Sequence, residues 1–275
     1  MKLSIQEDPL AQWAFELPAG VVKAFNQAGY TELAPHLHEI LIFLAVYSGI
    51  YTLSSVVTPA VYPAYRKLSK RNQVNFDMHV TSQVQAIVLC AFAWIIFFDP
   101  DLTSLTSHTP FSSMAISSAV GYFLWDLYVS IKYVNMFGMP FLAHAAAALF
   151  TFFEALRPFL HNYAAPFMLY EMSTPFVNNH WFASHVPGMI SPELQKINGL
   201  CLLAMFFIFR IVLGSYFGIK LFTEAFTNPP VGVPSWSLYA VLTTYSLLSA
   251  LNFFWFSKMI RLAAKAMRQS KRKSD

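Results

Sequence analysis

The sequence predicts an all-α, polytopic membrane protein with about seven transmembrane helices, because it contains that many apolar stretches able to cross a bilayer. Hydrophobic residues make up 56% of the 275 residues and charged residues only 12%, whereas a soluble domain carries about 25% charged residues. The mean hydropathy is +0.47. The composition therefore excludes an ordinary soluble enzyme or binding domain.

Charge and cysteine content narrow the function classes further. The formal net charge is +4, but the excess lies in a few short segments beside apolar stretches, which indicates membrane topology and not nucleic-acid binding. Cys90 and Cys201 lie in separate apolar runs, which is typical of small core residues and gives neither a disulfide framework nor a metal-binding pair. We predict no metal site and no bound cofactor. The sequence does not determine the oligomeric state, and a homodimer is one option.

Residues 1–34 are expected to form a luminal segment at the membrane interface. Trp13, Phe15 and Phe25 are interrupted by turn-forming residues such as Pro18, a pattern that suits an amphipathic segment lying on the bilayer. A basic start, a continuous apolar run and a small-residue cleavage site are not present together, so we expect the segment to be retained and not cleaved as a signal peptide.

The first part of the predicted transmembrane domain, residues 35–260, alternates apolar spans with loops of contrasting charge. A strongly basic loop after the first span is expected in the cytosol, which puts the N-terminus on the luminal side. The loop DPDLTSLTSHTP after the second span has no Lys or Arg and is expected in the lumen. The basic residues of the loop after the first span are Arg66, Lys67, Lys70 and Arg71. The first three spans are expected at residues 38–60, 77–98 and 114–133.

The second part begins with spans at residues 140–156 and 158–182, joined by a tight turn at Arg157–Pro158 that is expected to dip into the membrane. The next span, 197–226, is long enough to tilt strongly. A Pro-rich luminal turn then leads to a last span at 236–259. Because the span at 140–156 is short, a total of about six spans is an alternative.

The basic tail, residues 261–275, is expected in the cytosol. Its end, Lys271-Arg272-Lys273-Ser274-Asp275, resembles a cytosolic retrieval signal of the endoplasmic reticulum. The alternative is a tail that only binds anionic lipid, at about 1 kcal/mol per charge.

Polar residues inside the predicted spans carry the functional prediction, because a charge at mid-helix costs roughly 2.5 to 3.5 kcal/mol and persists mainly where it faces a cavity or a partner. Tyr122 and Asp126 share a helix face, since a step of four residues returns to nearly the same direction. His144 shares a face with Thr151, beside alanines that allow close approach of a helix or lipid chain.

The apolar stretch 142–182 is the densest in such polar groups. Glu171, Thr174 and Asn178 are expected on one side of their span, with His180 pointing roughly the other way. We predict His144, Asp126 and Glu171 as catalytic candidates. The predicted lipid-binding residues are Tyr122, Thr151, His161, Thr174, Asn178, His180 and Arg210.

Each of these residues also has a structural interpretation. His144 would then hydrogen-bond a neighbouring carbonyl, and Asp126 would pair with Arg210 or a tyrosine to hold helices together. The polar residues on the second span are expected to be interhelical hydrogen bonders; they are Thr81, Ser82, Gln83 and Gln85. His36, His38, His108 and His185 lie at or outside the predicted membrane boundary and carry little signal.

Several motifs together resemble the TLC domain shared by TRAM, Lag and CLN proteins, from about Arg66 to the end of the last span. They are GYFLWD, FLAHA, RPFLHNYAAPFMLYEMSTPFVNNHWF and a late helix with Asn198, Gly199 and Arg210. The pattern E-x-S-T-P-F-x-N-x-x-W at Glu171–Trp181 is the most specific. It is similar to small TLC-domain proteins of the endoplasmic reticulum, of fungal type, more than to ceramide synthases.

The resemblance implies a barrel of six helices around a central lipid cavity that is open to cytosolic acyl-CoA. Ceramide synthases use a pair of adjacent histidines on the helix that corresponds to residues 140–156. Here His144 matches one of them and Ala145 replaces its neighbour, and the acidic run that follows in those enzymes is absent, which argues against ceramide synthesis.

Two function classes follow. The first is acyl transfer or lipid remodelling, with acyl-CoA or a phospholipid as the donor substrate, His144 as base or acyl carrier, and Asp126 or Glu171 as the carboxylate that orients it. The second is a non-enzymatic protein that binds or moves a membrane lipid or regulates membrane composition, in which the same groups hold a headgroup. An ion channel or transporter is less favoured, because no pair of broken helices occupies corresponding positions.

Overall fold

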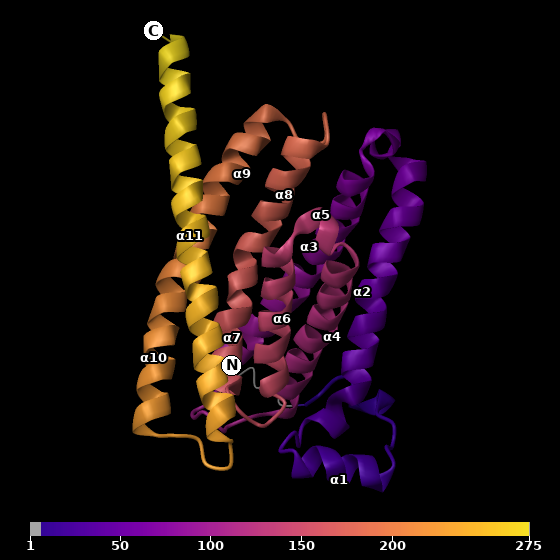
Figure 1. The fold of residues 1–275 in the computed structure, drawn as a ribbon, viewed down its shortest axis with the longest axis vertical. Coiled ribbons are helices and arrows are strands. Elements are labelled where there is room, and N and C mark those ends of the chain that lie inside the picture. The colour runs from indigo at the N-terminus through magenta and orange to yellow at the C-terminus, as the bar shows by residue number, and fades with distance from the viewer. Residues whose placement is uncertain (1–6, 275) are drawn as a thin grey trace.

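A computed structural model describes residues 7–274, with side chains described as far as Lys265. Among these residues every regular element is a helix (Figure 1), so the all-α prediction is confirmed. The retrieval-like sequence at Lys271–Asp275 lies outside the residues whose side chains are described. The elements are η1 (Ala11–Trp13), α1 (Ala19–Gln27), α2 (Leu33–Val61), η2 (Pro63–Lys67), α3 (Lys70–Phe97), α4 (Pro110–Lys132), α5 (Val134–Phe137), α6 (Met139–Glu154), α7 (His161–Met168), η3 (Leu169–Ser173), α8 (Thr174–His185), α9 (Pro192–Met205), η4 (Phe206–Leu213), α10 (Gly214–Thr227) and α11 (Ser235–Ser274).

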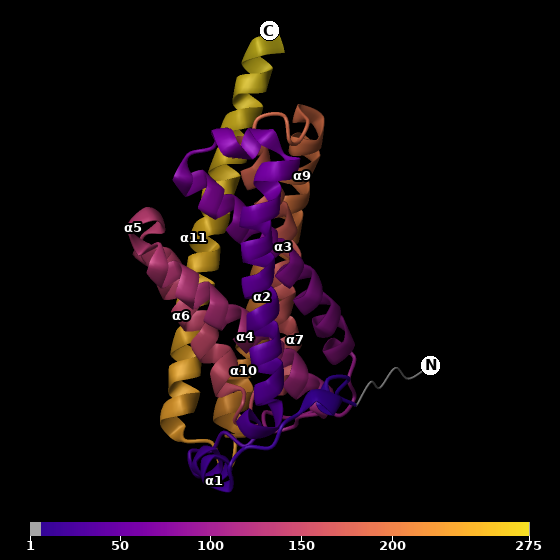
Figure 2. The same ribbon diagram turned by 90° about the vertical axis from the view of Figure 1, so that its right-hand side faces the viewer.

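Five helical segments of the described chain are long and apolar enough to cross a membrane, so the protein is a multi-pass membrane protein. They are α2, α3, α4, the continuous segment Pro192–Thr227, and α11 through Lys265. Two of the seven predicted spans do not reach the length of about 20 residues that a straight crossing needs: α6 has 16 residues, and the predicted span 158–182 is divided among α7, η3 and α8. Both nevertheless run beside the long helices (Figures 1 and 2).

Local sequence signals explain where the central helices begin. Thr109 caps α4 by accepting a hydrogen bond from the Ser112 backbone N–H, and the Ser112 hydroxyl accepts in return from Thr109 N–H. Pro110 stands at the first turn of α4, where no intrahelical donor is needed. At the start of α3, the Ser69 side chain accepts from the Asn72 N–H. These caps give hydrogen-bond acceptors to backbone N–H groups at the helix starts, which have no acceptor within the helix.

Helices α2 and α4 approach each other closely at Gly121. A Cβ atom there would lie 2.7 Å from the Ile40 carbonyl oxygen and 2.8 Å from the Phe43 Cβ. A glycine at this point therefore sets the distance between the two helices. Small residues play this role in membrane bundles because helices associate there through close packing.

The Gly121→Ala substitution is expected to lower the free energy of unfolding by about 1 to 3 kcal/mol, the usual cost of overpacking. The contact is with backbone atoms, so no side-chain rotation relieves it. Thermal melting in detergent measures the effect, with Gly49→Ala on α2 as the control, since a Cβ at Gly49 meets nothing within 4 Å. Equal melting temperatures for the two variants would contradict the assignment of Gly121 as the spacer.

An ion-pair network joins the N-terminal segment to the end of α6. Arg157 Nε donates to Glu154 Oε2 at 3.0 Å, and Arg157 Nη1 donates to the Ala28 carbonyl at 2.7 Å. The Glu154 carboxylate also accepts from the hydroxyls of Tyr30, at 2.6 Å, and Ser237. Two of the charged residues in the stretch 142–182 thus hold together the end of the bundle at which α1 lies (Figure 2).

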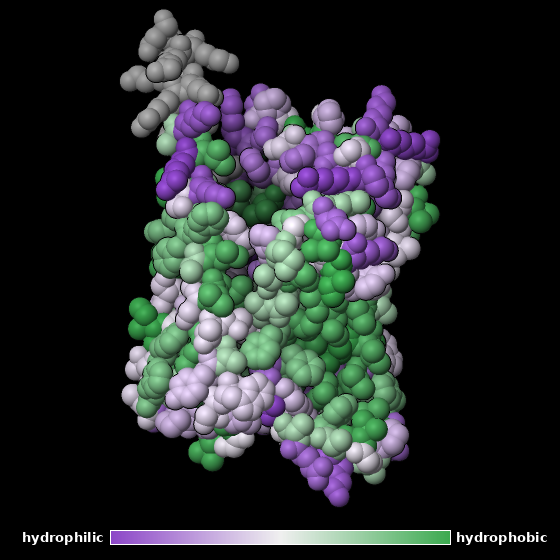
Figure 3. All heavy atoms as spheres, in the orientation of Figure 1, coloured by the Kyte–Doolittle hydropathy of each residue, from purple (hydrophilic) through white to green (hydrophobic). Residues whose placement is uncertain are grey.

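Charged side chains gather at the opposite end of the bundle. Figure 3 shows hydrophilic residues along the upper rim and a mainly hydrophobic band below it. This rim is where α2 connects to α3 and where α11 projects, and α4 ends somewhat below it (Figure 1). The basic residues of the α2–α3 connection and the start of α3 are Arg66, Lys67, Lys70 and Arg71, and Lys132 is at the end of α4.

Candidate functional site

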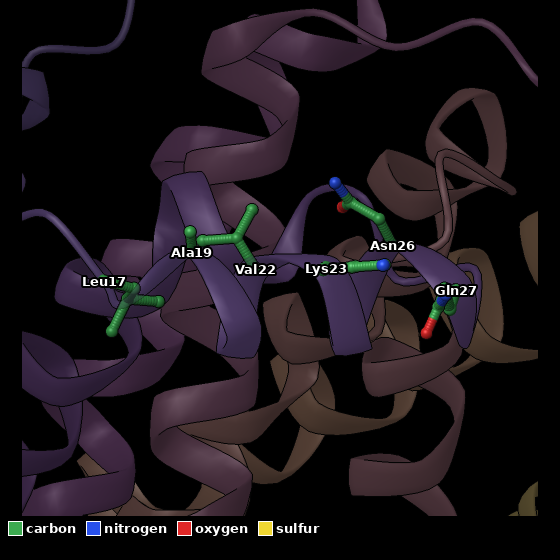
Figure 4. Close-up of a pocket in the computed structure, with 6 residues that line it drawn as sticks. All are labelled: Leu17, Ala19, Val22, Lys23, Asn26 and Gln27. Carbon is green, nitrogen blue, oxygen red and sulfur yellow. The ribbon is translucent and has the colours of Figure 1, made fainter.

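A surface pocket of about 670 Å³ lies on the amphipathic helix α1, outside the transmembrane bundle (Figure 4). None of the sequence-predicted site residues lines it. Its walls combine apolar side chains with Lys23 and two amides, as suits a helix at a membrane interface. The lining residues are Leu17, Ala19, Val22, Lys23, Asn26 and Gln27.

Inside the bundle, three charged side chains from separate elements come together. Asp126 on α4 and Glu171 on η3 are near enough for their charges to interact. Arg210 on η4 lies opposite them, with Nη2 at 3.9 Å from Glu171 Oε1. The side chains of Arg210 and Glu171 remain 12% and 18% exposed. The bundle interior therefore contains two carboxylates and one guanidinium that are shielded but still accessible.

The position of Arg210 depends on a π-helical segment, η4, within the long helix Pro192–Thr227. A π segment adds a residue to the helical turn, and such segments are frequent at functional sites. Arg210 Nε donates to Ser173 Oγ at 2.8 Å and to the Tyr170 carbonyl at 3.1 Å, and Nη2 donates to Thr174 Oγ1 at 3.3 Å. Nη1 donates to Asn252 on α11 at 3.5 Å. These bonds fix the guanidinium against three neighbouring elements.

Glu171 is positioned by the break between α7 and α8. Pro175 has no N–H to donate to the Glu171 carbonyl, which is the acceptor that an uninterrupted α-helix would use. The chain there forms the tighter helix η3 before α8 begins at Thr174. The break also leaves the Tyr170 carbonyl available to accept from Arg210. The predicted motif E-x-S-T-P thus has a structural explanation at its glutamate, serine, threonine and proline.

His144 lies on α6, and one nitrogen of its imidazole makes no hydrogen bond in the described chain. Its Nδ1 is buried without a hydrogen-bond partner, and its ring centroid is 6.1 Å from that of Trp255 on α11. The Arg210 charge is near enough to act on it. Within residues 7–265, no hydrogen bond or ion pair joins His144 to Asp126 or Glu171, so the structure brings no carboxylate into position to orient the imidazole.

Helix α11 connects the two parts of this polar site. Asn252 and Trp255 are three residues apart and therefore lie on one face of the helix. Asn252 contacts Arg210, and Trp255 contacts His144. We call the set Asp126, His144, Glu171, Arg210 and Asn252 the central polar site.

An aromatic wall with unpaired polar atoms adjoins the central polar site. The Tyr122 ring contacts those of Tyr47 at 5.2 Å and Trp125 at 5.6 Å, and its hydroxyl lies near the charges of Asp126 and Glu171. The hydroxyls of Tyr47 and Tyr170 and both polar atoms of Gln85 are buried without partners in the described chain. Buried polar groups are normally paired, by protein or by bound molecules. A water molecule or a polar ligand group beside them would satisfy these atoms.

Asn178 belongs to a neighbouring cluster nearer the basic rim. Its amide nitrogen donates to Gln83 Oε1 at 3.1 Å and to Ser82 Oγ at 3.4 Å. Its amide oxygen lies 2.7 Å from His79 Nδ1, whose ring packs against Trp181 at 4.7 Å. The prediction of interhelical hydrogen bonds is confirmed for Ser82 and Gln83. It is wrong for Thr81, which donates to the Asp77 carbonyl of its own helix, and for Gln85, whose polar atoms have no partner in the described chain. These contacts join α3 to α8.

Three of the predicted lipid-binding residues lie apart from the central polar site. His161 is fully buried, with Nε2 at 2.9 Å from the Ala155 carbonyl and Nδ1 at 2.7 Å from Ser112 Oγ. Thr151 donates to the Ala147 carbonyl of its own helix. His180 is exposed on α8. The structure therefore joins Tyr122, Thr174 and Arg210 to the three catalytic candidates.

Figure 3 also shows a hollow beside α11, just below the polar upper rim, with hydrophobic side chains on its floor. The hollow is at the height of the membrane-spanning part of the helices and beneath the basic end of the bundle (Figures 1 and 3). A lipid or a fatty-acyl chain would find apolar contacts there and charged groups at its mouth.

The fold and this interior define a multi-pass helical membrane protein with a polar site enclosed by its transmembrane helices. Comparison with known proteins matches residues 75–261 to the TLC domain family. The chain belongs to this family, so the resemblance drawn from its motifs is confirmed.

The relatives are TLC-domain proteins of fungi and animals. An uncharacterised TLC domain-containing protein of Schizosaccharomyces pombe is 33% identical, with 87% of this chain and 83% of that protein covered. Topoisomerase I damage affected protein 4 of Saccharomyces cerevisiae is 30% identical, over 84% and 85% of the two chains. Human TLC domain-containing protein 4 is 26% identical, over 82% and 89%. No solved structure matches the chain.

Proposed function

We propose that this protein binds a fatty-acyl lipid inside its helical bundle and acts on it by acyl transfer, with His144 as the reacting group. The single observation that carries the proposal is the imidazole of His144, buried within the bundle with an unpaired Nδ1. An unpaired polar atom in a membrane interior costs free energy unless a ligand or water satisfies it. The central polar site would hold the polar part of the lipid.

The charge distribution supports acyl-CoA as a donor. Basic residues gather at the end of the bundle above the hollow of Figure 3, where they would attract the phosphates of a coenzyme A moiety. The acyl chain would then extend between the helices, among aromatic and aliphatic side chains. A phospholipid donor would bring the same two parts, an anionic headgroup and an acyl chain.

The chemistry of the step balances without a metal or redox group. An imidazole nitrogen of His144 attacks the thioester carbonyl, a C–N bond forms, the C–S bond breaks, and the thiolate of coenzyme A leaves with the imidazole proton. An alcohol or amine then takes the acyl group and returns a proton to the imidazole. Arg210 would stabilise negative charge on the carbonyl oxygen.

A non-enzymatic lipid-binding function is the second candidate. It is favoured by the lack of any hydrogen bond between His144 and a carboxylate within residues 7–265, together with Ala145 beside it. Without an orienting carboxylate, an imidazole is a weaker base and nucleophile. In this alternative the central polar site holds a headgroup and no bond is made or broken.

Mass spectrometry separates the two candidates. The protein purified in mild detergent is analysed by native mass spectrometry for bound lipid, and by denaturing mass spectrometry after incubation with acyl-CoA for a covalent acyl mass. An acyl adduct that maps to His144, or turnover of acyl-CoA with an added acceptor, supports acyl transfer. Bound lipid with neither result supports the binding candidate, and a protein that carries no lipid at all contradicts both.

We further propose that about six of the helices form a barrel around the central polar site. We also propose that the protein resides in the endoplasmic reticulum with its C-terminus in the cytosol. The basic end of the bundle supports the orientation, since cytosolic loops carry the excess of Lys and Arg. Changing Lys271 and Lys273 to Ser is expected to let the protein reach later compartments without inverting it, because other basic residues near the end of α11 still fix its orientation. Fluorescence microscopy tests the location. A tail protected from protease in sealed microsomes would contradict the orientation.

A further inference from the structure

A second cluster of titratable residues lies where α2 begins, at the end of the bundle opposite the basic rim (Figure 1). Asp8, His38 and Glu39 each offer a ligand atom, and these atoms all lie within 4.8 Å of one another. His38 and Glu39 are buried, with 4% and 0% of their surface exposed. No metal site was predicted from the sequence, because Asp8 is about thirty residues away from the other two in the chain.

The contact between two carboxyl groups is the unusual feature. A carboxylate oxygen of Asp8 and one of Glu39 lie within 4.8 Å of each other. Two carboxylates repel at this distance unless a proton or a cation lies between them. Glu32 adds a third carboxylate to the same region. The facing groups are His36, His38 and His108, and no Lys or Arg forms an ion pair with these carboxylates in the described chain.

The arrangement around His38 suits a metal ion. His38 Nε2 lies 3.7 Å from Glu39 Oε1 and 3.1 Å from the Leu10 carbonyl oxygen. Donors bound to one zinc ion at about 2.0 to 2.2 Å are separated by similar distances. Asp8 also accepts from the Leu10 N–H at 2.7 Å, which holds its carboxylate beside the same carbonyl. One imidazole, two carboxylates and a backbone carbonyl are thus gathered around one point.

A neighbouring histidine provides the outer contact that metal-binding carboxylates usually have. His36 Nδ1 lies 3.1 Å and 3.0 Å from the two oxygens of Glu39. The other ring nitrogen of His36 is 3.5 Å from Glu32 Oε2. This chain of contacts fixes the Glu39 carboxylate against its own helix, so that it is already oriented toward Asp8 and His38.

We propose that Asp8, His38 and Glu39 bind a divalent transition-metal ion of the zinc class, with the Leu10 carbonyl as a further oxygen donor. The mixed nitrogen and oxygen donor set is one that Zn²⁺ accepts. The ion ties the N-terminal segment, through Asp8, to the first turns of α2. This site is separate from the central polar site and does not depend on the function proposed above.

The test uses the full chain without an affinity tag, purified in detergent, treated with EDTA and dialysed against a small excess of ZnCl₂. Metal content is measured by inductively coupled plasma mass spectrometry. We expect about one zinc per wild-type chain and a content at least about fivefold lower in Asp8→Asn and His38→Gln, because ligand loss weakens metal binding at least as much as loss of an outer contact. Glu7→Gln is the matched control, since Glu7 is exposed next to Asp8.

Thermal melting supplies a second readout that does not need the variants to be equally stable. Zinc is expected to raise the melting temperature of the wild type and of Glu7→Gln, because an ion that binds only the folded state stabilises it. It should not raise that of Asp8→Asn, whose side chain is half-buried at the edge of the cluster. Wild-type protein with negligible zinc, or equal zinc and equal stabilisation in Asp8→Asn and His38→Gln, would overturn the proposal.

Discussion

Replacing His144 with alanine is expected to abolish acyl adduct formation or acyl-CoA turnover while leaving the melting temperature close to that of the wild type. The physical reason is that Nδ1 of His144 has no hydrogen-bond partner, so its removal breaks no bond of the fold, whereas the proposed reaction has no other nucleophile. Loss of the reacting group should lower the rate by at least about 100-fold, the smaller end of what a positioned base or nucleophile supplies.

The matched control for this variant is His180→Ala. His180 is exposed on α8 and should be replaceable without effect on turnover or on stability. The role of His144 as the reacting group is contradicted if His144→Ala retains full turnover. A His144→Ala protein that fails to fold would instead assign a structural role to this histidine.

Replacing Arg210 with methionine is expected to reduce the free energy of unfolding by about 3 to 5 kcal/mol, the range seen when one partner of a buried ion pair is removed. Arg210 makes hydrogen bonds to the Tyr170 carbonyl and to Ser173, Thr174 and Asn252. Its removal deletes these hydrogen bonds, although the Tyr170 carbonyl still accepts from Ser173 Oγ, and it leaves the Glu171 carboxylate without its countercharge. Denaturation of the purified protein in mixed detergent measures the change.

The Glu171→Gln substitution, combined with Arg210→Met, is expected to restore part of that loss, because it removes the unpaired charge. Lys220→Met is the control for loss of a basic residue from the same long helix, since Lys220 is exposed. If the double variant is no more stable than Arg210→Met alone, the cost comes from the lost hydrogen bonds and not from the charge on Glu171.

The C-terminal ends of α2, α3 and α4 were predicted to within one residue, because they depend on local chemistry, whereas their starts were predicted four to seven residues too late. Apolar runs end where proline or charged residues interrupt them, and a membrane helix cannot readily continue through such residues. The examples are Pro63, the acidic loop that starts at Asp99 and the Pro-rich turn before α11. The break at η3 was not predicted as a separate element. The sequence around it is apolar and continuous, and only the missing N–H of Pro175 disturbs the hydrogen-bonding pattern.

The candidate site was partly predictable. Asp126, Glu171 and Arg210 stood out because charges are costly in a membrane interior, and the structure brings them together. Which groups pair could not be derived, since partners come from different helices. The pairing of Arg210 with Asp126, one of the alternatives, is not observed in the described chain, where Arg210 forms its ion pair with Glu171.

Two features needed the tertiary structure. His38 was interpreted as a boundary residue, and only the fold brings Asp8 beside it and Glu39. Glu154 and Arg157 lie in the stretch 142–182, which is densest in polar groups, but the Glu154 partners Tyr30 and Ser237 and the Arg157 partner Ala28 belong to distant parts of the chain. Contacts between residues so far apart in sequence leave no local pattern.

The π segment at Phe206–Leu213 has a consequence for how related chains should be aligned. Each residue added to or removed from a helix rotates everything beyond it by about 100°. A deletion within this segment would leave the span just as hydrophobic and nearly as long, so membrane insertion would be unaffected. Because a π turn holds about one residue more than an α turn, the shortened segment would return to an α-helix. The buried side of α10, formed by Gly214, Gly218, Leu221 and Ala225, would then keep facing its neighbours. Two homologues that differ by one residue here should therefore be aligned with the gap inside this segment, since both would present the same face of α10 to α11.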